Sequence, residues 1–342
     1  MNEQRAGERV ALADHTTLRV GGPSHLVATA SENELIDAVR AAEADGDAVL
    51  LLGGGSNLVV SDDGFAGTTI GIGHTGVDVE ETGDRVTLRV AAGESWDALV
   101  ARAVERGWSG LEAMSGIPGL VGATPIQNVG AYGAETSDVL VSVEVWDRLQ
   151  AERRTLGAAE CGFGYRSSIF KYAHRYIVLN VTFELARSGQ SAPIRYAELA
   201  RTLGVQSGET APLADVRDAV LGLRAGKGMV LDPADHDTWS AGSFFTNPIL
   251  PAIALPDGAP TYPADDGMVK TSAAWLIEHA GFHKGFGNDR AALSSKHTLA
   301  ITNRGSARAA DIIELAREIR DEVRGTFGIE LHPEPLLIGC SL

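Results

Sequence analysis

The sequence contains only 2 cysteines, Cys161 and Cys340, among 342 residues. This count excludes the disulfide framework of a small secreted fold and is typical of a protein of the reducing cytoplasm. Neither cysteine has a second cysteine or a close histidine at the spacing of a metal site, and the 9 histidines are scattered. We therefore expect buried, inert thiols, a cytoplasmic protein and no metal site.

Long hydrophobic runs are absent as well. The longest mostly apolar segment, residues 49–60, is interrupted by glycines and is too short to cross a bilayer. The opening stretch, MNEQRAGERVALADH, is polar and charged, unlike a signal peptide. We expect a protein that neither enters nor binds a membrane.

Positive charge is scarce. The chain has 29 Lys and Arg residues against 45 Asp and Glu residues, a formal net charge of −16, and no block of basic residues. Nucleic-acid binding needs a basic face, so we expect no nucleic-acid partner. An anionic small molecule would need a local cluster of basic side chains to overcome the global charge. With 44% hydrophobic residues, the chain can form sizeable cores, and its length predicts two or three domains.

The hydrophobic pattern predicts a mixture of strands and helices of the α+β class. Strands are expected at residues 24–30, 48–52, 58–61, 68–73, 139–148, 176–185, 240–246, 298–303 and 332–339, with a hairpin turning at 82–84. Helices are expected at residues 31–46, 95–106, 213–224, 272–280 and 306–324. Breaks near residues 75 and 226 divide the chain into parts 1–75, 76–225 and 226–335.

One glycine pattern, Gly71, Gly73 and Gly76 in GIGHTG, matches the dinucleotide fingerprint in spacing alone. The fingerprint needs a helix directly after the glycines, because the helix amides hold the pyrophosphate. Here the next residues, GVDVEETGDRVTLRV, have the alternation of a hairpin. We therefore exclude a Rossmann site at this position.

Two other glycine-rich stretches are stronger candidates for binding phosphate. SGIPGLVGATPIQNVGAYGAE (residues 115–135) is nearly uncharged and too rich in glycine and proline for a regular element, and GGGSN (residues 53–57) follows a predicted strand. Glycine lets backbone N–H groups converge closely on a bulky anion. Each stretch alone is equally well read as a tight packing turn. Together they favour a large dinucleotide held between two subdomains.

A set of motifs, in order from about Asp14 to Gly339, then indicates a family. The chain resembles the UDP-N-acetylenolpyruvoylglucosamine reductases, also called UDP-N-acetylmuramate dehydrogenases, in HTTLRVGG, GGGSNLVVSDDGF, SGIPGLVGATPIQNVGAYGAE, YRSSIFK, AGSFFTNP, SAAWLIEHAGFHKG and HPEPLLIG. The resemblance implies the bipartite FAD-binding fold of the p-cresol methylhydroxylase and vanillyl-alcohol oxidase type, plus a C-terminal α+β substrate domain. It makes 1–75 and 76–225 the FAD-binding subdomains and 226–335 the UDP-sugar domain, with the tail 336–342 returning to the first part.

The resemblance also implies the cofactors and the reaction. FAD is held non-covalently, NADPH is the electron source, and the enolpyruvyl ether of a UDP-sugar is reduced to the lactyl ether for peptidoglycan synthesis. The residues implied in FAD binding are Gly53, Gly54, Gly55, Ser56, Asn57, Leu58, Ser115, Gly116, Ile117, Pro118, Gly119, Gly122, Ala123, Thr124, Gln127, Asn128, Gly130, Ala131, Tyr132 and Gly133.

Three residues carry the chemistry in this comparison. Hydride addition to the terminal carbon leaves negative charge on the carbon that bears the carboxylate, so the site needs a carboxylate clamp and one proton donor. Arg166 is the implied clamp and Ser243 the implied proton donor. Beside a substrate carboxylate the pKa of Glu334 would rise, so that it could donate a hydrogen bond. Without the family match, each of the three is read as an ordinary structural or surface residue.

The substrate residues implied by the family pattern supply local positive charge. They are Tyr165, Lys227, Asn247 and Lys270, with Tyr196 from the inserted segment 187–212 and with Lys296 and His297 at the pocket edge. The family expectation for the oligomeric state is a monomer. Two alternatives remain open: another FAD-dependent oxidase of a hydroxy acid or alcohol with the same fold, and a non-catalytic module that binds a nucleotide sugar.

Overall fold

The computed structural model describes residues 7–342, apart from the side chain of Asp266, and these form two compact units. The first unit contains Leu26–Gly54 and Thr68–Gly226, and the second contains Glu8–His25, Gly55–Gly67 and Lys227–Leu342. The three-part division expected from the sequence is finer than this one and stays a prediction. Mixed helices and strands fill both units, so the α+β class is confirmed.

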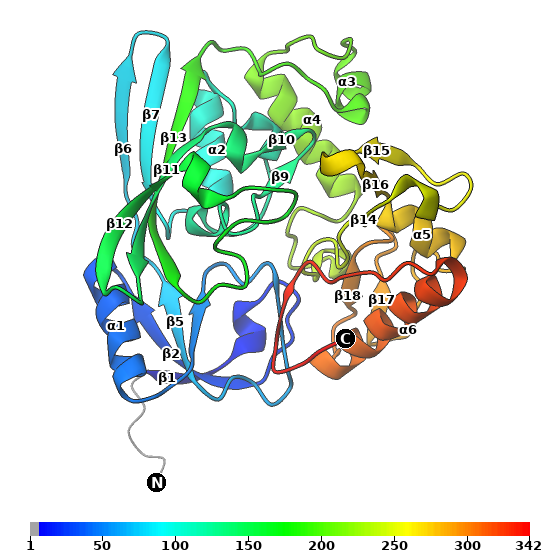
Figure 1. The fold of residues 1–342 in the computed structure, drawn as a ribbon, viewed down its shortest axis with the longest axis horizontal. Coiled ribbons are helices and arrows are strands. Elements are labelled where there is room, and N and C mark those ends of the chain that lie inside the picture. The colour runs from blue at the N-terminus through cyan, green and yellow to red at the C-terminus, as the bar shows by residue number, and fades with distance from the viewer. Residues whose placement is uncertain (1–6) are drawn as a thin grey trace. The chain divides into compact units, whose positions relative to one another are not determined.

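The first unit begins with a small sheet covered by one helix. Strands β2 (Pro23–Thr29), β5 (Thr68–Ile72) and β3 (Val49–Leu52) lie in this order, and β3 runs parallel to β5. Helix α1 (Glu32–Ala44) begins at the predicted cap, where the Ser31 hydroxyl accepts a hydrogen bond from the Glu34 N–H at 3.2 Å. Its buried face packs on the sheet, as Figure 1 shows.

A larger antiparallel sheet forms the rest of the core of the first unit. Its strand order is β12-β11-β13-β7-β6, with β8 also paired to β13 (Figure 1). The strands are β6 (Val77–Thr82), β7 (Arg85–Ala91), β8 (Trp108–Ser109), β11 (Leu140–Asp147), β12 (Glu152–Gly157) and β13 (Tyr176–Arg187). Helix α2 (Trp96–Glu105) packs on this sheet, with the buried rings of Trp96 and Phe183 6.0 Å apart. The hairpin β6–β7 follows the GIGHTG glycines, which confirms that no Rossmann helix is present there.

Short elements complete the first unit. They are β9 (Gly130–Ala131), β10 (Ala134–Glu135), α3 (Ala197–Leu203) and α4 (Leu213–Gly226). Helix α4 buries the predicted stripe Leu213, Val216 and Val220, and with α3 it forms a separate small core. The periodicity of the sequence therefore predicted this helix and its buried face correctly.

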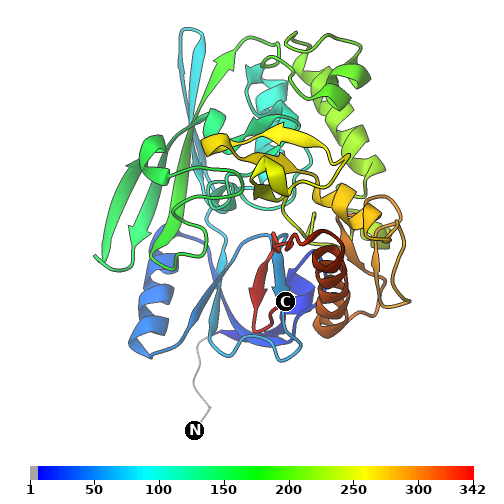
Figure 2. The ribbon, with the colours of Figure 1, turned by 45° about the vertical axis from the view of Figure 1, so that its right-hand side comes forward.

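The second unit is built around helix α6 (Ala309–Phe327), whose buried stripe packs against α5 (Ala273–His279). The C-terminal strand β19 (Leu336–Ile338) pairs in parallel with β4 (Leu58–Val60), and Figure 2 shows these two strands side by side. The other strands are β1 (Glu8–Ala11), β14 (Ile249–Leu250), β15 (Thr261–Pro263), β16 (Val269–Thr271), β17 (Ala291–Leu293) and β18 (Ile301–Asn303).

The strand predicted at residues 240–246 is wrong. This segment makes only two isolated bridges, Ser240 with Thr302 and Phe245 with Pro333. Gly242 has φ +75°, so the chain turns between the bridges and changes its pairing partner. Apolar residues alone did not reveal this change of direction.

Both cysteines are partly or fully buried and lie in separate units. Burial raises the pKa of the Cys161 thiol to about 11, and burial also raises the pKa of Cys340. The expectation of weakly reactive thiols is confirmed. In residues 7–342, no helix combines the length and hydrophobicity that crossing a bilayer requires.

Asp147, at the end of β11, provides a test of stability against pH. Its buried carboxylate accepts hydrogen bonds from Arg175 Nη2 at 2.6 Å and from the Leu149 N–H at 3.1 Å. The bond from Arg175 lowers the pKa of Asp147 to about 2. A lowered pKa stabilises the fold above the ordinary carboxyl pKa of about 4 and loses this effect as the pH falls towards 2.

We therefore expect Asp147→Asn to lower the free energy of unfolding at pH 7, with the deficit relative to the parent shrinking between about pH 4 and pH 2. Urea unfolding at a series of pH values measures this difference. The control is Asp78→Asn, because Asp78 is 80% exposed and only 3.4 Å from Arg89. A deficit for Asp147→Asn that does not change with pH would contradict the ionic explanation.

Candidate FAD and substrate site

The two glycine-rich stretches meet in the first unit. An added Cβ on Gly54 would stand 2.8 Å from the Cα of Gly119, and one on Gly53 would be 3.4 Å from the Leu120 side chain. Gly119 itself has φ +116°, which strongly favours glycine. The backbones of the two stretches therefore touch with no side chain between them, although 65 residues separate Gly54 from Gly119 in the sequence (119 − 54).

The N-terminal end of helix α2 holds the longer stretch in place. Trp96 donates from its indole Nε1 to Met114 O at 3.1 Å, and from its backbone N–H to Gly119 O at 3.1 Å. The Gly122 N–H donates to Ala92 O at 2.9 Å, and a Cβ on Gly122 would be 2.4 Å from the Ala92 Cβ. Gly122 thus has a packing role of its own, as the alternative reading of these glycines allowed.

Two polar side chains expected near the cofactor also shape the loop. Thr124 Oγ1 donates to Val121 O at 2.8 Å, and Asn128 Nδ2 donates to Glu135 Oε2 at 2.8 Å. Both side chains are buried, and Asn128 has φ +45°, a conformation that asparagine tolerates better than most residues. These bonds keep the stretch folded without a regular element.

The contact between the two glycine-rich stretches fits the diphosphate of a dinucleotide. Gly54 and Ala123 are exposed, and Gly53, Gly119 and Leu120 are partly exposed, so main chain with little side-chain cover lies at the surface. Main-chain donors presented in this way are the usual ligands of a phosphate that has few basic side chains near it. The residues present therefore suit FAD.

We expect Gly54→Ala to weaken FAD binding by about 10- to 100-fold, because overpacking against Gly119 forces the two stretches apart. Titration of the apoprotein with FAD measures the effect. Gly222→Ala is the matched control, since Gly222 lies in helix α4 and a Cβ there meets nothing within 4 Å. Equal FAD affinity of the two variants would show that the contact of the two stretches does not shape the cofactor site.

Arg166 lies at the tip of a tight hairpin in the first unit. Gly164 and Ser167 exchange backbone hydrogen bonds at 3.1 and 3.2 Å, which leaves Tyr165 and Arg166 as the two turn residues. Arg166 has φ +51°, an uncommon value for a residue with a side chain, and such conformations concentrate at functional sites. Its Nη2 donates to Gly130 O at 2.8 Å. The implied carboxylate clamp is therefore attached to the implied cofactor stretch.

Tyr196 also lies against this stretch. Its ring stands edge-on to the ring of Tyr132, with centroids 5.4 Å apart, and it is 43% exposed. A Cβ on Gly133 would be 3.7 Å from the Tyr196 Cβ. The inserted segment 187–212 thus places an exposed aromatic ring beside Tyr132, which the sequence alone did not reveal.

Ser243 and Glu334 come together in the second unit. Phe244, next to Ser243, accepts a hydrogen bond at its carbonyl from the Glu334 N–H at 2.9 Å, and Phe245 bridges Pro333. Asn57 Nδ2 lies 3.4 Å from Glu334 O, so the GGGSN stretch contributes to the same neighbourhood. Two of the three implied catalytic residues are therefore on adjacent extended segments.

The implied substrate residues of the second unit lie on several elements. Asn247 accepts at Oδ1 from the Ala273 N–H at 2.9 Å, and Lys270 is in β16 opposite Ile249. Lys296 donates to Asp235 at 2.5 Å, a contact that raises the pKa of Lys296 and balances its charge. His297 follows in the same loop, and Lys227 opens the last segment of the unit.

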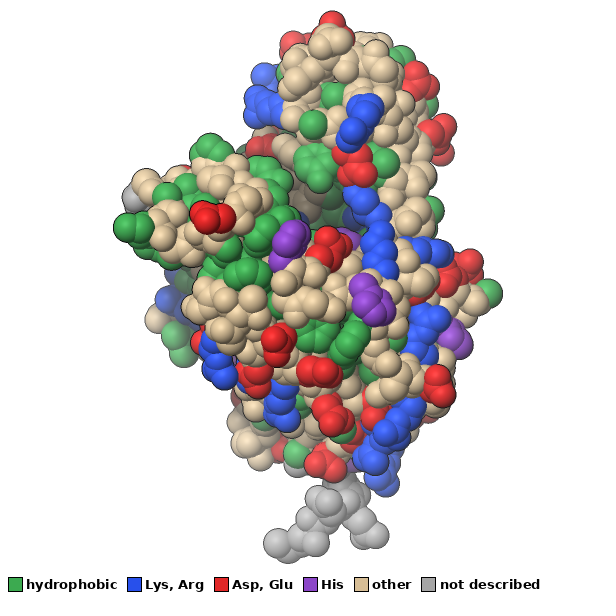
Figure 3. All heavy atoms as spheres, turned by 90° about the vertical axis from the view of Figure 1, so that its right-hand side faces the viewer, with side chains coloured by type: hydrophobic (Ala, Val, Ile, Leu, Met, Phe, Trp, Pro, Cys, Tyr) green, Lys and Arg blue, Asp and Glu red, His purple; other side chains and the backbone are tan. Residues whose placement is uncertain are grey.

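Acidic and basic side chains are neighbours over much of the face drawn in Figure 3. The Lys296–Asp235 pair is one such contact. Since a paired lysine contributes little net charge, the positive charge that a UDP-sugar needs from this unit depends more on Lys227 and Lys270.

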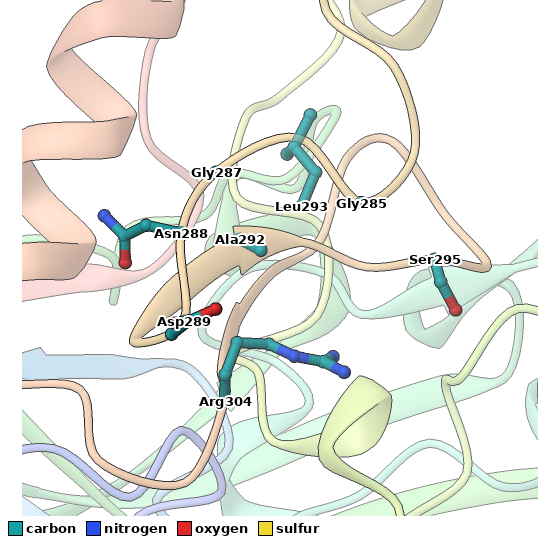
Figure 4. Close-up of a pocket in the computed structure, with 8 residues that line it drawn as sticks. All are labelled: Gly285, Gly287, Asn288, Asp289, Ala292, Leu293, Ser295 and Arg304. Atoms are coloured by element: carbon teal, nitrogen blue, oxygen red, sulfur yellow. The ribbon is translucent and has the colours of Figure 1, made fainter.

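A cavity of about 340 Å³ opens elsewhere in the second unit (Figure 4). Its wall is formed by residues of the turn before β17 and by two polar side chains, and its lining residues are Gly285, Gly287, Asn288, Asp289, Ala292, Leu293, Ser295 and Arg304. Within the described part of the chain, this lining includes none of the implied site residues. The Arg304 guanidinium is bound to buried Asp237 at 2.9 Å, which makes it a structural group.

Two residues of the first unit contact the longer stretch and were not expected from the sequence. Asp97 accepts a hydrogen bond from the Gly116 N–H, and Arg217 pairs with Asp97. They stand 120 residues apart, on two helices whose sequence patterns indicate only amphipathic packing, so no motif connects them.

Comparison with known proteins decides the family. Residues 23–155 match the model of an FAD-binding domain, and residues 232–338 match the C-terminal domain of UDP-N-acetylenolpyruvoylglucosamine reductase. The reductase of that name from Thermobifida fusca is 58% identical over 97% of this chain and 98% of its own length. The one from Saccharopolyspora erythraea is 54% identical over 97% of this chain and 95% of its own length.

The chain belongs to the UDP-N-acetylenolpyruvoylglucosamine reductase family. Among solved structures, the reductase from Thermus caldophilus matches 97% of this chain and 98% of its own length, with a TM-score of 0.66 and 28% identity. The predictions of the family, of an FAD-dependent oxidoreductase and of a bipartite FAD-binding fold with a further C-terminal domain are confirmed.

Proposed function

We propose that this reductase family member converts UDP-N-acetyl-3-O-(1-carboxyvinyl)glucosamine to UDP-N-acetylmuramate, a peptidoglycan precursor, with NADPH as reductant. Family membership over nearly the whole chain is the observation that carries the proposal. Bound FAD supplies the hydride chemistry, relaying a hydride from NADPH to the terminal carbon of the enolpyruvyl group. We further propose that the chain acts as a cytoplasmic monomer.

Ser243 is the proposed proton donor to the carbon beside the carboxylate. A serine hydroxyl is a weak acid in water, but the carbanion-like centre left by hydride addition is a strong base. The buried rings of Phe244 and Phe245 follow Ser243 directly and limit the access of water to this segment. Gly242, with φ +75°, sets the direction of the chain just before the serine.

Arg166 is the proposed partner of the substrate carboxylate. A guanidinium presents five N–H donors in a planar fork, which suits a carboxylate better than a point charge does. The bond from Arg166 Nη2 to Gly130 O and the hairpin turn restrain the direction of the fork. Charge that develops on the enolate is then met by donors that are already oriented.

Glu334 is proposed to carry a proton and to donate a hydrogen bond to the enolate. Prolines stand on both sides of it, at positions 333 and 335, and the N–H of Glu334 is fixed to Phe244 O. Tyr165, Tyr196, Lys227, Asn247, Lys270, Lys296 and His297 remain the proposed UDP-sugar contacts. The FAD contacts implied by the family stay proposals on the same footing.

A stopped-flow experiment separates this function from its two alternatives. Purified protein reconstituted with FAD should lose flavin colour with NADPH and regain it, without oxygen, only when the enolpyruvyl sugar nucleotide is added. A hydroxy acid or alcohol oxidase would be bleached by its own substrate and reoxidised by oxygen. A protein that stays colourless after addition of FAD would instead be a nucleotide-sugar-binding module.

A further inference from the structure

Asp97 connects the glycine-rich stretch 115–135 to helix α2. It lies in the first turn of α2, and its Oδ1 accepts a hydrogen bond from the Gly116 N–H at 2.6 Å. Charge-assisted hydrogen bonds of this length are stronger than neutral ones. The other bonds from the start of α2 to this stretch are neutral, including that from the Trp96 indole to Met114 O.

Arg217, from helix α4, grips the same carboxylate. Its Nη1 donates to Asp97 Oδ1 at 2.7 Å and its Nη2 donates to Asp97 Oδ2 at 2.9 Å, in the parallel two-bond geometry typical of arginine and carboxylate. The Arg217 side chain is only 17% exposed. Gly116, with φ +71°, is thus fixed through Asp97 to two helices at once.

The electrostatics of the pair agree with this geometry. Although burial acts in the opposite direction, the hydrogen bonds from Arg217 and from the Gly116 N–H lower the pKa of Asp97, and the bond to Asp97 raises the pKa of Arg217. Both groups therefore stay charged near neutral pH. The contact lies at the beginning of the stretch, three residues before Gly119, which touches Gly54.

We propose that Asp97 and Arg217 are positioning residues that set the conformation in which the stretch 115–135 binds FAD. The inference rests on the proposed role of this stretch in FAD binding. Neither residue has to touch the cofactor: the carboxylate fixes the direction of the Gly116 peptide, and Arg217 fixes the carboxylate. Helix α4, which carries Arg217, ends at Gly226, directly before the proposed substrate residue Lys227.

The first test is Asp97→Asn. An asparagine oxygen can still accept from the Gly116 N–H, but the amide then has no charge for Arg217 and its NH2 group faces the N–H donors of that arginine. We expect the FAD dissociation constant of the apoprotein, measured by quenching of flavin fluorescence, to rise about 10- to 100-fold. The visible circular dichroism of bound FAD should change as well, because the flavin ring is held differently.

A graded pair of variants guards against a simple folding defect. Arg217→Lys keeps the charge without the fork, so it should weaken FAD binding less than Arg217→Gln does. The matched control is Arg85→Gln, which removes an exposed ion pair to Glu184 at 2.9 Å in the same unit and should change FAD affinity by less than about twofold.

The outcomes distinguish this inference from the proposed function. If the parent protein binds no FAD, the proposed function fails. If the parent binds FAD while Asp97→Asn and both Arg217 variants match it within about twofold, with unchanged circular dichroism of the flavin, the positioning role is overturned. A lower melting temperature of the apoprotein with unchanged FAD affinity also overturns it, since that result marks a purely structural pair. If Asp97→Asn does not fold, the order of Arg217→Lys and Arg217→Gln decides.

Discussion

Ser243→Ala should leave the reduction of the flavin by NADPH nearly unchanged and slow its reoxidation by the enolpyruvyl sugar by about 10²- to 10⁴-fold or more. Only the second half-reaction needs a proton at the carbon beside the carboxylate, and NADPH leaves before that step. The substitution removes one oxygen next to buried Phe244 and leaves the main-chain bond from Phe244 N–H to Leu299 O in place. Stopped-flow absorbance of the flavin records the two half-reactions separately.

The control for this experiment is Thr246→Ala. It removes a hydroxyl three residues further along the same segment, where Thr246 Oγ1 makes only a long 3.4 Å contact with His332 O. Both half-reactions of the control should stay within about threefold of the parent. Equal slowing of both half-reactions in Ser243→Ala would remove Ser243 from the role of proton donor and suggest a disturbed flavin site instead.

The regular elements were predictable where local chemistry alone decides the structure. The Ser31 cap and the buried stripe of α4 each depend on residues within two or three turns, and both are present in the structure. The segment around Gly242 was not predictable in the same way, because its pairing changes from Thr302 to Pro333. Those partners lie about sixty to ninety residues away, beyond the reach of a local pattern.

The candidate site shows the same division between motif and contact. Arg166 and Gly130 were both singled out from the sequence, but the hydrogen bond between them depends on a hairpin with a left-handed residue at its turn. Asp97 and Arg217 carry no motif, so their contact with each other and with Gly116 appears only in three dimensions. The sequence identified the chemistry of the site, while the structure identified the groups that hold it.

Arg166→Lys should reduce the rate of flavin reoxidation by about 10²- to 10³-fold, although it preserves the charge. A lysine reaches one point with a compact ammonium group, so it cannot bind the Gly130 carbonyl and present a planar fork to a carboxylate at the same time. Flavin reduction by NADPH should change far less, since no carboxylate is involved in that step. Single-turnover kinetics at saturating substrate measures the loss without the contribution of weaker binding.

A comparison with Arg187→Lys tests whether the effect belongs to the site. Arg187 forms an exposed ion pair with Glu81 at 3.1 Å, where a point charge serves as well as a fork. This variant should keep both half-reactions. If Arg166→Lys also turned over at the rate of the parent, a single positive charge would be enough, and the oriented fork at the tip of the 164–167 hairpin would have no part in stabilising the enolate.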